Sequence, residues 1–301
     1  MLPKNPFIEK PVMSQIKTHG IIMGNLGNAY TDLCEAKKAL VYYNAAIKIA
    51  QETGDKEIEG RWLGNIGIAY SILGKLKYSV AYYKNAVNIA QETGDKKGEG
   101  AWLGDLGIAY HDLGKTRKAI KHFKKALKIS LEIGDKQGEC AWLGNLGYVY
   151  HDLGEVRNAI DYLEKALKIS LEIGDRRKEG KWFGGLGIVY GSLYETKKAI
   201  CYYEKAIRIS QKIGDRKNEG RWINNLGNIF KDEKKYKKAL ACYLLDKNIR
   251  SQIEDADILT TESDIKDLEK ELGEKEFEKL VAEVKPVAEE IVKKILEETS
   301  A

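Results

Sequence analysis

A fixed period of 40 residues is the feature that most constrains the fold of this 301-residue chain. The dipeptide Gly-Asp recurs with this spacing at residues 54–55, 94–95, 134–135, 174–175 and 214–215. Tryptophan keeps the same spacing at Trp62, Trp102, Trp142, Trp182 and Trp222. Self-similarity at such a period is typical of stacked supersecondary units that contact only their neighbours. Six units fit, within residues 16–255.

Each unit is predicted to form two helices, as residues 95–134 illustrate. Asp95 suits an N-cap because its carboxylate can accept from free amides of the first turn. Gly114 ends the first helix, and Gly134 supplies a left-handed turn after the second. Apolar residues follow the helical period at Trp102, Leu103, Leu106, Ala109, Tyr110 and Leu113, then at Ala119, Ile120, Phe123, Ala126, Leu127 and Leu131. No segment alternates with period two, so no sheet is expected.

The first helix of each unit is rich in glycine. Gly100, Gly104 and Gly107 fall on one side of the helix, although each costs about 1 kcal/mol relative to alanine. We expect the missing side chains to let a neighbouring backbone approach closely. Glycine pairs of this kind imitate phosphate-binding loops, but no strand precedes them, so we do not predict a nucleotide site.

The pattern resembles the tetratricopeptide repeat. That family carries a bulky residue, Leu-Gly, Tyr and Gly on its first helix, and Ala, an aromatic residue and Ala on its second. Here the matching residues are Leu103, Leu106, Gly107, Tyr110, Gly114, Ala119, Phe123 and Ala126. The usual repeat has 34 residues and often a late proline, whereas Gln211 or Leu131 stands at that place here. Units of 40 residues ending in Gly-Asp are similar to those of the Pins/LGN spindle adaptors and, more loosely, kinesin light chain.

The resemblance implies an all-α fold, a right-handed α-solenoid of six helical hairpins plus C-terminal capping helices. Residues 1–15 contain three of the four prolines, so we predict an extended N-terminal segment there. Residues 16–255 form the six repeats, and residues 256–301 an acidic C-terminal helical cap. Asp246 stands where earlier units have alanine, which indicates that regular stacking ends there. An alternative is that the final helix pairs with a second copy of the chain, giving a homodimer.

The formal charge of +5 hides an asymmetry between the two parts. Residues 255–301 hold 15 acidic and 7 basic side chains, whereas residues 1–254 hold 43 basic and 30 acidic ones. The basic part therefore suits an acidic protein or peptide partner. A basic row at Lys56, Lys96, Lys136, Arg176 and Arg216 suggests nucleic acid as a further partner, but it lacks interleaved exposed aromatic residues, so this interpretation is disfavoured.

The first helices are expected to line a concave groove that binds a peptide or protein segment. Amide side chains repeated once per unit can bond an extended peptide backbone whatever its side chains are, because each offers a donor and an acceptor. Counting 100° per residue from the core stripe gives the groove set: Asn25, Asn28, Arg61, Asn65, Ile68, Asp105, Ile108, His111, Asn145, Tyr148, His151, Lys181, Ile188, Arg221, Asn225 and Asn228. Alternatively, the asparagines bond only between adjacent helices or to water.

No catalytic constellation is visible. The four histidines form no nucleophile–base pattern, and no Cys-x-x-Cys pair indicates zinc, so neither an enzyme, a metal nor a cofactor is predicted. The chain has no apolar run long enough for a bilayer and no signal-peptide core, from which we expect a cytoplasmic protein. The leading hypothesis is therefore a non-enzymatic interaction scaffold or adaptor. The alternative is a structural element that self-assembles through its C-terminal helix.

Overall fold

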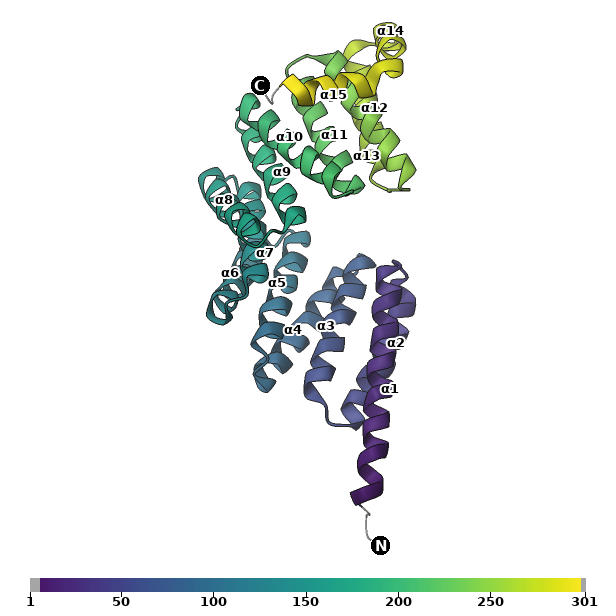
Figure 1. Cartoon of the computed structure of the whole chain (residues 1–301), viewed down its shortest axis with the longest axis vertical. Helices are drawn as coiled ribbons and strands as arrows, with labels where there is room; N and C mark the ends of the chain where they lie inside the picture. Colours follow the sequence, from purple (N-terminus) through teal and green to yellow (C-terminus); the bar gives the residue numbers. More distant parts are fainter. Residues whose placement is uncertain (1–5, 299–301) are drawn as a thin grey trace. The chain divides into compact units, whose positions relative to one another are not determined.

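The computed structural model describes the backbone of residues 6–298 and the side-chain surroundings of residues 13–297. Over this range the chain forms α-helices and one short 3-10 helix, without any strand (Figure 1). The all-α fold predicted from the repeat pattern is thereby confirmed. The chain divides into two compact units, Met1–Val149 and Tyr150–Ala301, whose boundary falls within one helix, α7.

Helical hairpins follow one another with the 40-residue period. Their first helices are α1 (Pro6–Asp32), α3 (Lys56–Ile72), α5 (Lys96–Asp112), α7 (Lys136–Asp152), α9 (Arg176–Ser192) and α11 (Arg216–Asp232). Their second helices are α2 (Ala36–Glu52), α4 (Leu76–Thr93), α6 (Thr116–Ile133), α8 (Val156–Glu172), α10 (Thr196–Lys212) and α12 (Tyr236–Gln252). The chain then continues through α13 (Ile258–Leu272), α14 (Glu274–Val284), η1 (Lys285–Val287) and α15 (Ala288–Glu298).

The aspartate of each Gly-Asp pair caps the following helix, as predicted. Asp95 Oδ1 accepts from the Gly98 amide at 2.8 Å, and four further aspartates accept from the residue three positions on, namely Asp55, Asp135, Asp175 and Asp215. Glu99 lies four residues after Asp95, where it is 6 % exposed and bonds both Lys96 Nζ and Gln91 Nε2. The sequence analysis did not single out this glutamate, although it recurs at the same step.

Aromatic rings, rather than backbone, fill the space above two of the three glycines predicted to lie on one side of the first helix. A Cβ on Gly104 would lie 2.0 Å from the Trp142 ring, and one on Gly107 would lie 2.7 Å from Phe123. At Gly104 and Gly107 the expected close backbone approach is therefore wrong, because each of these two glycines leaves a socket for a large ring from another helix, whereas Gly100 has the Ile129 side chain and the Ala126 carbonyl oxygen as neighbours. Phe123 and Trp142 themselves stack with centroids 6.3 Å apart, which confirms tryptophan as a residue that packs between repeats.

The N-terminal helix begins earlier than the sequence predicts. Helix α1 starts at Pro6, so residues 6–15 are helical where we expected an extended segment, and residues 1–5 lie outside the described residues. Proline needs no amide partner at the first helical position, which makes Pro6 compatible with a helix start. The helix then runs without a break into the first repeat.

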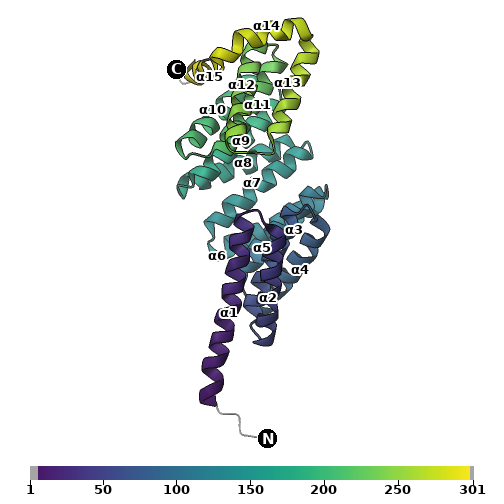
Figure 2. The same cartoon turned by 90° about the vertical axis from the view of Figure 1, so that its right-hand side faces the viewer.

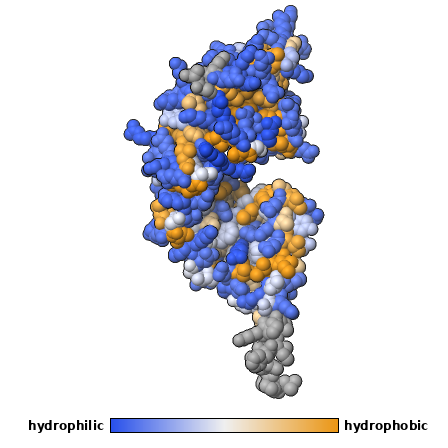
Figure 3. All heavy atoms as spheres, in the orientation of Figure 1, coloured by the Kyte–Doolittle hydropathy of each residue, from blue (hydrophilic) through white to orange (hydrophobic). Residues whose placement is uncertain are grey.

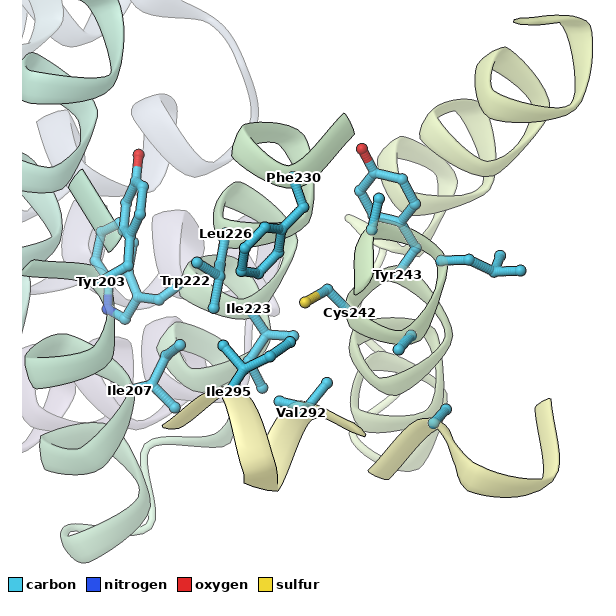
Figure 4. Close-up of a cluster of buried hydrophobic side chains, with 14 of the residues drawn as sticks. Tyr203, Ile207, Trp222, Ile223, Leu226, Phe230, Cys242, Tyr243, Val292 and Ile295 are labelled. Atoms are coloured by element: carbon cyan, nitrogen blue, oxygen red, sulfur yellow. The ribbon is translucent and has the colours of Figure 1, made fainter. Parts of the chain in front are cut away.

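The C-terminal helices cover the last hairpin of the second unit. Helix α13 lies beside α12, and α15 runs across α12 (Figures 1 and 2). Val292 and Ile295 of α15 are buried in one cluster with Ile223 of α11 (Figure 4). Arg208 Nη2 of α10 donates to the Leu296 carbonyl. The apolar side of α15 is thus used within its own chain.

On the face shown in Figure 3, hydrophilic side chains and apolar patches lie side by side in both units. None of the helices in the described range combines the length and the apolar character needed to cross a membrane.

Candidate functional site

The residues predicted to form the groove fall in both units, and each unit has its own part of the surface. In the first unit the set lies on α1, α3, α5 and the start of α7; in the second it lies on the end of α7, α9 and α11. Most of these side chains are half-buried, as expected for residues that stand beside the core and still reach solvent.

In the first unit, two of the asparagines bond each other. Asn65 Nδ2 of α3 donates to Asn28 Oδ1 of α1 at 2.8 Å, and the Tyr43 hydroxyl of α2 donates to the same oxygen at 2.8 Å. Asn28 therefore joins three helices. These asparagines therefore bond between adjacent helices, as the alternative interpretation of their repetition predicts. The side-chain oxygen of Asn65 takes no part in this bond and can accept from another partner.

Asp105 interrupts the asparagine row at the corresponding place in α5. Burial raises the pKa of its carboxyl to about 7, and the Asp105 charge together with burial raises the pKa of the Tyr83 hydroxyl. A carboxyl of this kind changes its charge near neutral pH, unlike the amides of Asn65 and Asn145 at the equivalent positions.

The remaining predicted residues of the first unit are spread along its first helices. Asn25 and Arg61 are exposed, and Arg61 Nη2 lies 3.5 Å from the Glu57 carboxylate. Ile108 of α5 is 39 % exposed. The half-buried members are Ile68, His111, Asn145 and Tyr148.

In the second unit, three predicted residues share one pocket. Ile188 of α9, together with Asn225 and Asn228 of α11, lines a surface pocket of about 550 Å³. The same pocket is lined by Gly191, Ser192, Tyr194, Tyr203, Ile229 and Asp232. Its volume is within the range of small-molecule and side-chain sites. An apolar side chain, two amides and a carboxylate therefore converge on one hollow.

Asn225 and Asn228 differ in how much of their amide is available. Asn228 Oδ1 accepts from the Tyr243 hydroxyl at 2.6 Å, and its Nδ2 lies 3.4 Å from Asn224 Oδ1. Asn225 has no bond of this kind to another described residue, so its donor and acceptor both remain for a ligand. The pocket thus combines one amide fixed by the fold with one that is free to bind.

Other predicted residues of the second unit lie outside this pocket. Lys181 Nζ lies 4.8 Å from the Trp182 ring centroid, and the Arg221 guanidinium lies 5.8 Å from that of Trp222. His151 Nε2 lies 3.2 Å from Ser192 Oγ, a residue of the pocket wall. Lys181 and Arg221 therefore contact tryptophan rings and do not line the pocket.

The basic row at the helix starts is neutralised by the buried glutamates. Lys96 Nζ lies 2.8 Å from Glu99 Oε2, and Arg176 Nη1 lies 2.7 Å from Glu179 Oε2. The three other cations of the row form the same ion pair, at Lys56, Lys136 and Arg216. The row is therefore no strip of unpaired positive charge of the kind that binds phosphates. In the described part of the chain, no group of three or more His, Cys, Asp or Glu residues could hold a metal ion.

Tyr194 and Asp232 are two of the pocket residues that sequence reasoning missed. Tyr194 stands where three of the four earlier repeats have glycine, and Asp232 follows the last apolar turn of α11. The replacement of the usual loop glycine by tyrosine is the sequence feature that could have identified Tyr194. Asp232 has no such feature, because Asp32, Asp112 and Asp152 occupy the same position in other repeats.

Solved structures of other proteins share this fold. The apo form of RapI has 20 % sequence identity and a TM-score of 0.67, covering 91 % of this chain and 99 % of its own. BtubC from P. vanneervenii has 21 % identity and a TM-score of 0.63, covering 73 % and 92 %. A Rap protein in complex with competence and sporulation factor has 15 % identity and a TM-score of 0.62, covering 90 % and 82 %. At these identities the likeness concerns the fold alone.

Family models identify the repeat itself. Among curated proteins no sequence matches this chain. Two models, both described as tetratricopeptide repeat, match residues 22–53 and residues 73–132 and 139–212, together more than half of the chain. The Pins/LGN type of repeat stays a prediction. The stacked hairpins, the glycine sockets filled by aromatic rings and these matches agree: the chain belongs to the tetratricopeptide repeat family.

Proposed function

We propose that this protein is a non-enzymatic scaffold that binds an extended peptide or protein segment along the first helices of its repeats. The observation that carries the proposal is the pocket between α9 and α11, where Ile188 and Asn225 meet at positions chosen from the repeat pattern. An apolar side chain beside a free amide suits a peptide, because the amide bonds its backbone while the isoleucine contacts a side chain.

Two proteins of the same fold support this proposal by analogy. The Rap protein described above is in complex with competence and sporulation factor, and the Rap conjugation gene regulator of the plasmid pLS20 is in complex with the Phr* peptide. The latter has 17 % identity and a TM-score of 0.56. The complex with the Phr* peptide favours a peptide as the ligand here.

Selection from a random dodecapeptide library, displayed on phage, tests the proposal without a known partner. We expect the full chain to enrich a family of peptides whose synthetic forms bind in a fluorescence polarisation assay. Asn225→Ala removes the free amide of the pocket and should weaken binding about fivefold to tenfold, the loss expected for one or two hydrogen bonds.

The matched control is Asn88→Ala, which removes an exposed asparagine from the second helix α4. This variant should bind the selected peptides as the natural chain does. Enrichment of no peptide, or equal affinities for the Asn225 variant and the natural chain, would overturn the proposal. Circular dichroism of each variant checks that its helices remain.

The self-assembling alternative has less support. It requires the apolar side of α15 to be exposed to a second copy, but Val292 is 1 % exposed and Ile295 3 % exposed within their own chain. Opening this contact would uncover the cluster around Ile223. We therefore do not propose α15 as an assembly element.

A further inference from the structure

A strained residue borders the pocket between α9 and α11. Tyr194 has φ +57°, in the left-handed region, where the equivalent positions of three other loops carry Gly74, Gly114 and Gly154. Those of two more carry Cys34 and Lys234 with a similar φ, so Tyr194 is the one aromatic residue of the series. A bulky side chain in this region is uncommon, because its Cβ crowds the backbone. Strain of this kind is typical of sites where the side chain has a function.

The Tyr194 side chain is not used by the fold. It is 87 % exposed, the most exposed large apolar or aromatic side chain of the described residues, and its ring stacks on no other described ring. Yet the residue lines the pocket together with Asn225 and Asp232. The face of the Tyr194 ring is therefore free to stack on a group that binds in the pocket.

Asp232 supplies a negative charge to the same pocket. It is exposed at the last residue of α11 and forms no hydrogen bond or ion pair within the described part of the chain. Of the neighbouring lysines, Lys231 interacts electrostatically with Asp267 of α13, Lys235 Nζ lies 2.7 Å from Glu233 Oε2, and Lys234 forms no ion pair with Asp232 in the described part of the chain. The Asp232 carboxylate is therefore not already neutralised.

We infer that this pocket is a subsite for a cationic side chain, best an arginine, of the bound peptide. A guanidinium can stack its plane on a tyrosine ring and at the same time donate two hydrogen bonds to a carboxylate. The amide of Asn225 lies in the same pocket for the adjoining peptide backbone. The inference deepens the proposed function and rests on it.

A subsite for a cationic side chain lies here in a part of the chain that carries a net positive charge. Residues 1–254 carry an excess of basic side chains, which favoured an acidic partner. Exposed charges farther away than about 8 to 10 Å are largely screened at physiological salt, so the contacts inside the pocket decide which side chain it accepts. A peptide with acidic residues along most of its length and one arginine at this position satisfies both.

The peptides selected in the experiment above test the subsite. We expect arginine to be enriched at one position, and replacement of that arginine by citrulline, which keeps the shape and loses the charge, to weaken binding about tenfold or more. Asp232→Asn should cause a similar loss with the arginine peptide and little further loss with the citrulline peptide. Tyr194→Gly should weaken the arginine peptide, and Tyr194→Phe should retain it.

Asp112→Asn is the matched control. Asp112 is the equivalent carboxylate of α5, but the loop residue 38 positions before it, which corresponds to Tyr194, is Gly74, so that loop offers no ring to Asp112. This variant should bind the arginine peptide normally. Selected peptides without a preferred cation, or a cation that binds equally to the Asp232 variant, would overturn the subsite and leave the proposed function standing. Failure to select any peptide would overturn both.

Discussion

The hairpins α9–α10 and α11–α12 occupy successive places in the repeat, yet one is followed by another repeat and the other by the cap. Helices α10 and α12 have the same length of 17 residues. At equivalent positions α10 has exposed Lys205 and buried Ala206, whereas α12 has half-buried Leu245 and buried Asp246. The repeats therefore end through a change of side chains, while the length of the second helix stays the same.

The first helices of the two hairpins show the same difference. Gly184 of α9 accommodates the Trp222 ring, while the equivalent residue of α11 is Asn224. No tryptophan follows α11, and Asn224 Nδ2 instead donates to Asp264 Oδ2 of α13 at 2.9 Å. An aromatic contact between repeats is replaced by a hydrogen bond between the last repeat and the cap.

The largest effect is expected at Asp246, which is fully buried. Its oxygens both lie 2.8 Å from Arg250 Nε, and one accepts from the Thr261 hydroxyl of α13. Burial raises the pKa of this carboxyl, and the hydrogen bonds from Thr261 and Arg250 oppose that rise. Asp246→Ala restores the residue of an ordinary repeat but leaves Arg250 buried with one partner fewer, so the free energy of unfolding should fall by about 3 kcal/mol or more.

Urea denaturation followed by circular dichroism measures this loss. Asp267→Ala, at an exposed position of α13, is the control and should change the stability by less than about 0.5 kcal/mol. If Asp246→Ala were as stable as the control, the buried ion pair would not hold the cap. The double variant Asp246→Ala, Arg250→Leu should recover part of the loss, because no uncompensated charge stays buried.

Ile295→Ala tests the other contact of the cap. This side chain is 3 % exposed in the cluster with Trp222 and Ile223, and its truncation should cost about 2 to 4 kcal/mol. Val287→Ala, at a residue that is 37 % exposed, should cost less than about 1 kcal/mol. Thermal unfolding of both variants provides the measurement. Equal melting temperatures would mean that α15 does not pack on α12 in solution.

Gly184→Ala tests the interior side of the comparison. The added Cβ would lie 2.5 Å from the Trp222 ring, so the ring must shift. Overpacking costs about 1 to 3 kcal/mol, against a gain of about 1 kcal/mol in helix propensity, so we expect a net loss of up to about 2 kcal/mol. The quenching of tryptophan fluorescence should change with it. At the equivalent position of α11, Asn224→Ala meets no ring, and its loss should come from the hydrogen bonds to Asp264 and Asn228.

Features that are repeated along the chain could be predicted from the sequence, whereas features that occur once could not. The caps at Asp95 and its equivalents and the tryptophan contacts were found because each is repeated with an elementary physical role. The hydrogen bond between Asn224 and Asp264 and the pocket shared by Tyr194 and Asp232 each occur once. They join residues brought together by packing, at 40 and 38 positions apart in the chain, so no local pattern marks them. The filling of the glycine sockets by rings was missed because spacing places a glycine on a face without saying what covers it.

The smallest effect concerns the loops of the two hairpins, where Tyr194 and Lys234 both have a positive φ, of 57° and 59°. Replacing either residue with glycine relieves about 1 kcal/mol of strain, partly offset by the larger entropy of the unfolded chain, so each variant should unfold at an equal or slightly higher temperature. The two variants should differ only in binding. Lys234→Gly should keep the affinity for the selected peptides, whereas Tyr194→Gly should lose affinity while it is no less stable. If Tyr194→Gly lost both stability and binding, the tyrosine would instead support the loop. A tyrosine that serves only to contact the peptide can be removed without lowering the stability of the hairpin.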